Sequence, residues 1–135
     1  MNSTESWGDW IRRGAAESFC YLTTMGRRTG KAHTIEIWFA VAGQRVYVLS
    51  ERGEAADWVR NLMVQREVGL RLGGQAGKAV ARVVRDPEEG LLGRRAIAAK
   101  YEGWQEGAVL PRWVAAALPV ALEPFLSEEV PGGSV

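Results

Sequence analysis

The chain has 135 residues, the length of one domain with a core of its own, and carries 17 basic and 16 acidic residues. This balance argues against a nucleic-acid or membrane-surface protein, so a cluster of cations would be a local feature. A single cysteine, Cys20, excludes an intramolecular disulfide and fits a reducing cytoplasm, and one cysteine with one histidine cannot form a conventional zinc site.

The first 17 residues have the pattern of a short amphipathic helix. Trp7, Trp10, Ile11 and Ala15 share one helical face, whereas the polar side mixes both signs of charge. The apolar stripe is short, which favours a helix packed on the domain over one lying on a membrane. No run is apolar for long enough to span a membrane and no signal-peptide pattern is present, so we expect a cytoplasmic protein without a membrane span.

Two strand-like runs follow, joined by a short loop. Strand-forming residues fill 19–25, and residues 33–41 alternate so that Ile35, Ile37 and Phe39 share one face. Gly26 and Gly30 mark the loop, since glycine adopts backbone angles that other residues resist. The sequence therefore predicts a hairpin whose second strand extends to Val41.

The hairpin loop is unusually basic. It holds Arg27, Arg28, Thr29 and Lys31, with His33 just beyond. Arginine forks and exposed amides suit phosphate oxygens, so this loop is a candidate anion site. The alternative is a solvated turn whose cations serve solubility. The spacing does not match the Walker phosphate loop, and the following run is a strand, whereas a Walker loop opens a helix.

The remaining elements are predicted from periodicity and turn residues. Trp58 and Asn61 lie three residues apart and share a helical face, either at a site or in ordinary core and surface positions. Pro119 favours an edge strand or a first position. In order, we expect a strand at 45–50, a helix at 54–65, strands at 68–72 and 78–84 joined by a loop at 73–77, a helix from the Asp86 cap to about Tyr101, a helical turn at 112–117, a strand at 118–123 and a disordered tail at 127–135.

This order predicts an α+β fold, a small barrel of five or six strands with two or three helices. The elements do not alternate as in a doubly wound sheet, and no GxGxxG motif is present. A hydrolase is disfavoured, because a lone His33 in a basic strand leaves no Ser-His-Asp arrangement.

The run Leu22–Gly30 (LTTMGRRTG), followed by VYVLS and by Trp58 and Asn61, resembles the deazaflavin-dependent nitroreductase family. The similarity extends from about Phe19 to residues 118–120. It implies a split β-barrel (FMN-binding-like), mostly antiparallel, that uses the 8-hydroxy-5-deazaflavin coenzyme F420. The implied reaction is hydride transfer to an activated acceptor such as a quinone, enone or nitroaromatic. Family analogy also implies a homodimer.

The resemblance also implies roles for particular residues. The cofactor would be bound by Arg27, Arg28, Lys31, His33, Trp38, Val48, Ser50, Trp58 and Asn61. Tyr101 and Trp104 would border the acceptor and act in catalysis, Tyr101 as the proton donor. No metal is expected.

Two departures from the family pattern bear on function. Glu51 stands where relatives tend to carry lysine, and only Tyr101 remains of a run of three tyrosines, with Trp104 and Gly107 at the other two places. Cofactor binding is thus better supported than nitroreduction. The alternatives are an FMN enzyme of the pyridoxamine-phosphate oxidase type and a non-catalytic deazaflavin carrier or sensor. A nucleic-acid-binding protein is the least favoured alternative, because the cations are confined to one loop.

Overall fold

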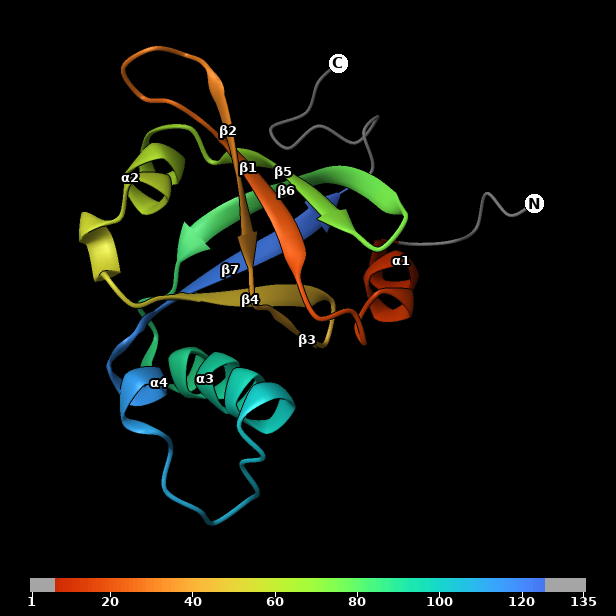
Figure 1. The fold of residues 1–135 in the computed structure, drawn as a ribbon, viewed down its shortest axis with the longest axis vertical. Coiled ribbons are helices and arrows are strands. Elements are labelled where there is room, and N and C mark those ends of the chain that lie inside the picture. Colours follow the sequence, from red (N-terminus) through yellow and green to blue (C-terminus); the bar gives the residue numbers. More distant parts are fainter. Residues whose placement is uncertain (1–6, 126–135) are drawn as a thin grey trace.

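The computed structural model describes residues 7–125, which form a curled antiparallel sheet flanked by helices (Figure 1). The seven strands are β1 (Cys20–Met25), β2 (Ala32–Ile37), β3 (Ala40–Ala42), β4 (Arg45–Ser50), β5 (Glu67–Leu72), β6 (Gln75–Val83) and β7 (Leu118–Phe125). The helices are α1 (Trp7–Arg13), α2 (Asp57–Val64), α3 (Pro87–Tyr101), α4 (Arg112–Ala116) and the short 3-10 helix η1 (Gly53–Ala55). None of the helices within residues 7–125 has the length and hydropathy needed to cross a membrane.

The strand order explains how the sheet becomes a split barrel. Across the sheet the order is β2-β1-β5-β6-β7-β4-β3, so β2 and β3 lie at opposite edges. Only Trp38 and Phe39 separate these two strands in the chain, so the sheet must curl until its edges meet there. The barrel stays open beside β2, because β3 pairs with residues 45–47 of β4 and leaves residues 48–50 without a neighbour on that side.

A side chain from α3 stabilises the corner between β2 and β3. The Tyr101 hydroxyl accepts a hydrogen bond from the Phe39 amide (3.1 Å) and is also 3.0 Å from the Phe39 carbonyl oxygen. The phenol thus takes the place that a neighbouring strand would fill, and the Phe39 ring is fully buried in the barrel. The single strand predicted for 33–41 is therefore two strands, broken where this hydroxyl satisfies the backbone.

The barrel interior is filled by alternate side chains of the strands and by two helices. Trp10 and Ile11 from α1 and Leu62 from α2 are buried against it. The largest fully buried aliphatic side chains of the strands are Leu22, Val46, Val48, Val120 and Leu122. Burial of such side chains contributes most of the stability of a domain this size, at roughly 1.5–3 kcal/mol each.

Helix α3 is capped at its start and packs on the barrel in its middle. The Asp86 carboxylate accepts a hydrogen bond from the Glu89 amide (2.8 Å), the cap that the sequence predicted, and Pro87 occupies the first turn. At Gly93 a Cβ atom would lie 3.0 Å from Cδ1 of Tyr47, so glycine allows α3 to pack directly on β4.

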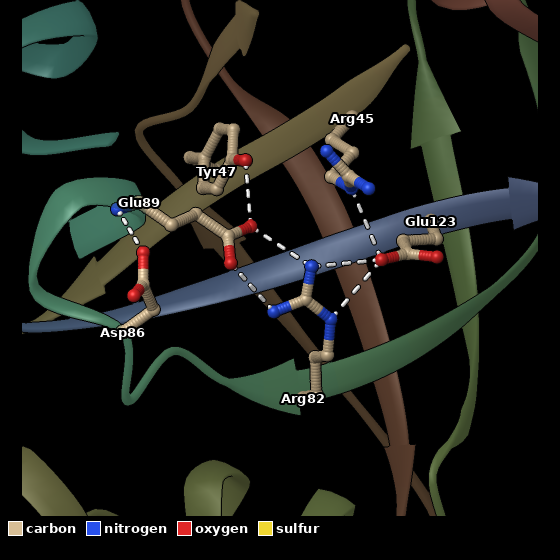
Figure 2. Close-up of polar contacts among 6 residues, drawn as sticks. All are labelled: Arg45, Tyr47, Arg82, Asp86, Glu89 and Glu123. Atoms are coloured by element: carbon tan, nitrogen blue, oxygen red, sulfur yellow. Dashed lines mark hydrogen bonds and ion pairs between the residues drawn. The ribbon is translucent and has the colours of Figure 1, made fainter. Parts of the chain in front are cut away.

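A closed network of charges joins β4, β6, β7 and α3 (Figure 2). It consists of Arg45, Tyr47, Arg82, Glu89 and Glu123. Arg82 binds Glu89 in a bidentate manner (2.9 and 2.8 Å) and also binds Glu123 (3.0 and 2.8 Å). Arg45 donates to Glu123 (3.0 Å), and the Tyr47 hydroxyl donates to Glu89 (2.8 Å). Each member therefore has a partner inside the protein.

The fold class and most element positions are confirmed, with several corrections. The first helix ends at Arg13, before Gly14, and the predicted part over 1–6 lies outside the described residues, as does the tail at 127–135. The loop at 73–77 is shorter, because β6 already begins at Gln75. The helix predicted at 54–65 is split by the extended Ala56.

The prediction for Pro119 was wrong. Strand β7 lies between β6 and β4, so Pro119 is the second residue of an inner strand. Its carbonyl oxygen still accepts a hydrogen bond from the Val84 amide (2.9 Å). Proline is tolerated there because it lacks only the backbone N–H donor and keeps its carbonyl acceptor. Strand β6 ends at Val83, one residue before the Val84 that bonds to this carbonyl.

Candidate active site

The basic hairpin loop between β1 and β2 is held in one shape by its own backbone. The Gly26 amide donates to the Lys31 carbonyl (2.7 Å), and the Gly30 amide donates to the Gly26 carbonyl (2.7 Å). The Thr29 hydroxyl accepts a bond from the Lys31 amide (3.2 Å). A Cβ atom at Gly26 would lie only 2.8 Å from this hydroxyl oxygen, so the loop requires glycine at that position.

Asn61 of α2 anchors this loop. Its side-chain oxygen accepts hydrogen bonds from the backbone amide (3.1 Å) and the guanidinium (2.8 Å) of Arg27, and its side-chain nitrogen donates to the Thr24 hydroxyl (3.2 Å). Asn61 is only 5 % exposed, which makes these bonds necessary to offset its burial. Arg27 also pairs with Asp57 (3.2 Å). Helix α2 and the loop therefore form one unit, visible at one end of the molecule in Figure 1.

A cavity of about 640 Å³, here called the loop cavity, opens beside this unit. It lies at the split in the barrel, because Ile35 and Ile37 of β2 and Leu49 and Ser50 of β4 line it together. The residues that line it are Thr24, Gly26, Arg27, Arg28, Thr29, His33, Ile35, Ile37, Leu49, Ser50, Glu51, Arg52, Ala56, Asp57, Trp58 and Asn61.

The lining of the loop cavity combines arginines and apolar side chains with the acidic Glu51 and Asp57. Along β2 the lining residues run from His33 beside the loop to Ile37 at the corner, a span of about 13 Å at the usual rise per residue. Arg28 and Arg52 line the cavity, and within residues 7–125 neither forms an ion pair or a side-chain hydrogen bond. An anion bound here would meet arginines that no protein group has yet neutralised.

A second cavity of about 570 Å³, here called the corner cavity, adjoins the first. Both are lined by Ile37, Leu49 and Glu51, so ligands in the two would be neighbours. The other lining residues of the corner cavity are Phe19, Glu36, Trp38, Ile97, Glu102 and Trp113. The ring of Trp38 stacks on Tyr101 (4.2 Å between centroids) and meets the edge of Trp113 (5.9 Å).

The structure brings most of the predicted cofactor-binding residues together. Those that line the loop cavity are Arg27, Arg28, His33, Ser50, Trp58 and Asn61. Lys31 lies in the same loop but outside the lining, Trp38 lines the corner cavity, and Val48 is fully buried in the barrel core. The Ser50 hydroxyl donates its proton to the Gly53 carbonyl (2.8 Å). The polar groups that β4 offers to the cavity are therefore those of its backbone.

The two residues predicted to be catalytic lie outside both cavities. The Tyr101 hydroxyl is 2.8 Å from the Ser18 carbonyl in addition to its contacts with Phe39, and burial raises its pKa. The indole nitrogen of Trp104 donates to the Ala108 carbonyl (2.7 Å), and the ring lines a separate cavity on α3 near Arg95. In this arrangement neither side chain faces the neighbouring ligands that the loop and corner cavities would hold.

Cys20 is buried inside the barrel. Its side chain has no solvent exposure, and burial raises the pKa of its thiol to about 12. It is therefore a small core residue and not a reactive thiol.

Sequence reasoning missed part of the cavity lining. Ile35 and Ile37 were recognised only as the apolar face of a strand, and Arg52 was given no role. Asp57 and Asn61 are four residues apart on one helix, a spacing that could have indicated their common contact with Arg27.

Comparison with known proteins places this chain in a family. Residues 6–121 match the family model described as F420H(2)-dependent quinone reductase. No curated protein matches the sequence closely enough to count as a relative.

Among solved structures, the protein Rv2991 from Mycobacterium tuberculosis has a TM-score of 0.69 at 18 % identity, over 83 % of this chain and 76 % of its own. An F420-H2 dependent reductase, FDR-A, has a TM-score of 0.60 at 14 % identity (79 % and 95 %). An FAD-binding protein from Mesorhizobium loti has a TM-score of 0.57 at 13 % identity (84 % and 86 %). These similarities confirm the split-barrel fold. Because the family model covers most of the sequence, the chain belongs to the F420H(2)-dependent quinone reductase family and is an F420-dependent reductase.

Proposed function

We propose that this reductase binds F420 in the loop cavity and passes a hydride to a quinone or a comparable activated acceptor in the corner cavity. The observation that carries the proposal is the loop cavity itself, where Arg28 and Arg52, which have no side-chain partner within residues 7–125, share the lining with the apolar side chains at the split. Hydride transfer needs donor and acceptor in contact, and the two cavities share Ile37, Leu49 and Glu51.

The residues of the loop cavity fit a deazaflavin. Arg28 and Arg52, with Lys31 nearby in the loop, would hold its phosphate and acidic tail, since their side chains have no other partner among residues 7–125. Ile35, Ile37, Leu49 and Trp58 would contact the ring. The unpaired edge of β4 at residues 48–50 offers backbone groups to the polar edge of the ring. Reduced F420 supplies a hydride, and a quinone becomes the hydroquinone by accepting that hydride and one further proton.

Anchoring and positioning are the proposed roles of the residues behind the cavity walls. Asn61 and Arg27 fix the loop against α2, so that Arg28 and Lys31 are presented from a rigid base. Tyr101 fixes the corner and stacks on Trp38, which lines the proposed acceptor cavity. The proton-donor role predicted for Tyr101 stays a prediction, and its hydroxyl must leave two backbone carbonyls before it can donate to an acceptor.

The test is titration of the purified chain with F420 and separately with FMN, followed by fluorescence. We expect F420 to bind at least about tenfold more tightly, a difference of roughly 1.4 kcal/mol. Tighter binding of FMN would replace the proposal with a flavin enzyme. In a second step the chain is given F420H2 and a naphthoquinone. If the bound reduced cofactor is consumed by no acceptor of the quinone, enone or nitroaromatic classes, the chain is a carrier.

The homodimer, the single domain and the cytoplasmic location expected from the sequence belong to the same proposal. A buried, unpaired Cys20 agrees with a reducing compartment. Sedimentation of the free and F420-bound chain measures the oligomeric state directly, and a monomer in both forms would contradict the dimer.

A further inference from the structure

We propose that the corner cavity selects planar acceptors that carry a positive charge and discriminates against acceptors that carry a carboxylate or sulfonate. The inference rests on the proposed function, because it names the substrate class of the acceptor cavity. It depends on three features of that cavity: its aromatic walls, its carboxylates, and the absence of a cation among its lining residues.

The walls of the corner cavity suit a flat, apolar group. Phe19, Trp38 and Trp113 line it, and the exposed fractions of Phe19 and Trp38 are 40 % and 37 %. Because both rings line the same cavity, they offer a shared apolar surface to a ligand there. Trp38 is fixed in orientation by its stacking on Tyr101, so the surface that it offers the cavity is preformed.

Three carboxylates line the same cavity, from three different parts of the chain. Glu36 comes from β2, Glu51 from the turn after β4 and Glu102 from the end of α3. Glu36 accepts one bond from the Tyr21 hydroxyl (2.8 Å), and Glu102 accepts one from the indole nitrogen of Trp113 (3.0 Å). Neutral donors leave the negative charge of a carboxylate in place, with lone pairs to spare. Glu51 has neither an ion pair nor a side-chain hydrogen bond among the described residues.

No lysine, arginine or histidine lines the corner cavity within residues 7–125. Of the cations that are close in the chain, Arg52, next to Glu51, lines the adjoining loop cavity, and Lys100 and Arg95 are engaged elsewhere. Lys100, two residues before Glu102, donates to the carbonyls of Ala15 and Glu17. Arg95 lies over the ring of Trp104, in the separate cavity on α3. The corner cavity is therefore lined by carboxylates and aromatic rings, whereas the arginines line the loop cavity, and Glu51 borders both.

The test uses 1,4-naphthoquinones that carry, on the same short linker, a quaternary ammonium, a hydroxyl or a sulfonate group. Binding to the F420-loaded chain is measured by quenching of tryptophan fluorescence, and turnover is measured with F420H2. At low salt we expect the ammonium compound to bind at least about tenfold more tightly than the sulfonate, with the hydroxyl compound between them. The ratio should shrink toward one at about 0.5 M salt, because these carboxylates are open to solvent.

The double variant Glu36→Gln with Glu102→Gln removes two charges and keeps both hydrogen bonds, since glutamine oxygen still accepts from Tyr21 and Trp113. Neither residue lines the loop cavity, so F420 affinity is a valid internal check. We expect the ammonium-to-sulfonate ratio to fall at least about threefold, with binding of the hydroxyl compound little changed. Glu106→Gln is the matched control, because Glu106 is exposed and lines the separate cavity on α3. Glu102→Gln alone replaces the double variant if that one does not fold.

A ratio near one in the wild-type chain, or an unchanged ratio in the double variant, would overturn the inference. Failure of the proposed function would give a different result. The chain would then not bind F420, or none of the three quinones would consume F420H2. Selective binding of the ammonium compound without turnover would support the binding preference and count against catalysis.

Discussion

Two groups of charged side chains in this protein differ in whether their partners are internal. In the closed network, Arg82 has both Glu89 and Glu123, and Arg45 shares Glu123 (Figure 2). In the hairpin loop, Arg27 has Asn61 and Asp57, whereas the side chains of Arg28 and Lys31 have no partner within residues 7–125. The contrast separates charges that stabilise the fold from charges that await a ligand.

The contrast is also visible in burial and position. The closed network sits where β6, β7 and α3 meet, and the Glu89 side chain is only 18 % exposed. Arg28 and Lys31 are exposed at the tip of a hairpin. Arg27 is the intermediate case, since it lines the loop cavity yet is held by α2. Substitutions in the two groups should therefore change different measurements.

The largest effect is expected at the tip of the loop. Arg28→Ala with Lys31→Ala should weaken F420 binding by about 3 kcal/mol, roughly 150-fold, because each charge-assisted hydrogen bond is worth about 1.5–3 kcal/mol. The free energy of unfolding should stay the same. Fluorescence titration and urea denaturation check the two statements. Arg66→Ala is the control, an exposed arginine outside the loop cavity, and unchanged affinity in the double variant would remove the loop from the site.

In the closed network the pattern should reverse. Arg82→Met keeps the apolar stem but leaves Glu89 and Glu123 without their shared cation. We expect the free energy of unfolding to fall by about 2 kcal/mol, a value reduced for partial exposure, with F420 affinity unchanged. Urea denaturation with the control Arg66→Met measures this. If Arg82→Met lost cofactor binding without losing stability, the proposed difference between the two groups of charges would be wrong.

Acid should weaken the closed network. The hydrogen bonds from Arg82 lower the pKa of the Glu89 carboxyl below its usual range. A lowered folded-state pKa gives stability that is present above the unfolded-state pKa and is lost as pH falls through the folded-state value. The stability that this group contributes should thus decline as the pH falls below about 5. In Glu89→Gln this part of the pH dependence should vanish in thermal unfolding curves; if the slope persists, other carboxylates cause it.

The smallest effect on turnover is expected from an uncharged group with internal partners. Tyr101→Phe removes the hydroxyl that satisfies the backbone at Phe39, so we expect a loss of about 1 kcal/mol in stability. Turnover at saturating F420H2 should change by less than about threefold, because the proposed role is to position Trp38. A fall of tenfold or more with normal stability would instead confirm Tyr101 as the proton donor.

Local patterns predicted what depends on local residues. Strand β4, helix α3 with its Asp86 cap, and the basic loop are placed almost as the sequence indicated, because alternation, capping and glycine spacing act over a few residues. The break at Trp38–Phe39 was not predictable in this way, since its cause is a hydroxyl that lies 62 residues away in the sequence. The same holds for the corner cavity, whose three carboxylates come together only when the barrel closes.

The anchoring of Arg27 by Asn61 divides the hairpin loop into a fixed base and a replaceable tip. Gly26 and Arg27 are bound to β1, α2 and Lys31 through backbone contacts, so their positions are part of the fold. Arg28 extends beyond that base, whereas Gly30 adopts a φ of +74°, which favours glycine, and its amide donates to the Gly26 carbonyl. For protein engineering, residue 28 is therefore the position to exchange for a shorter or less acidic cofactor tail, with Gly26 and Gly30 kept.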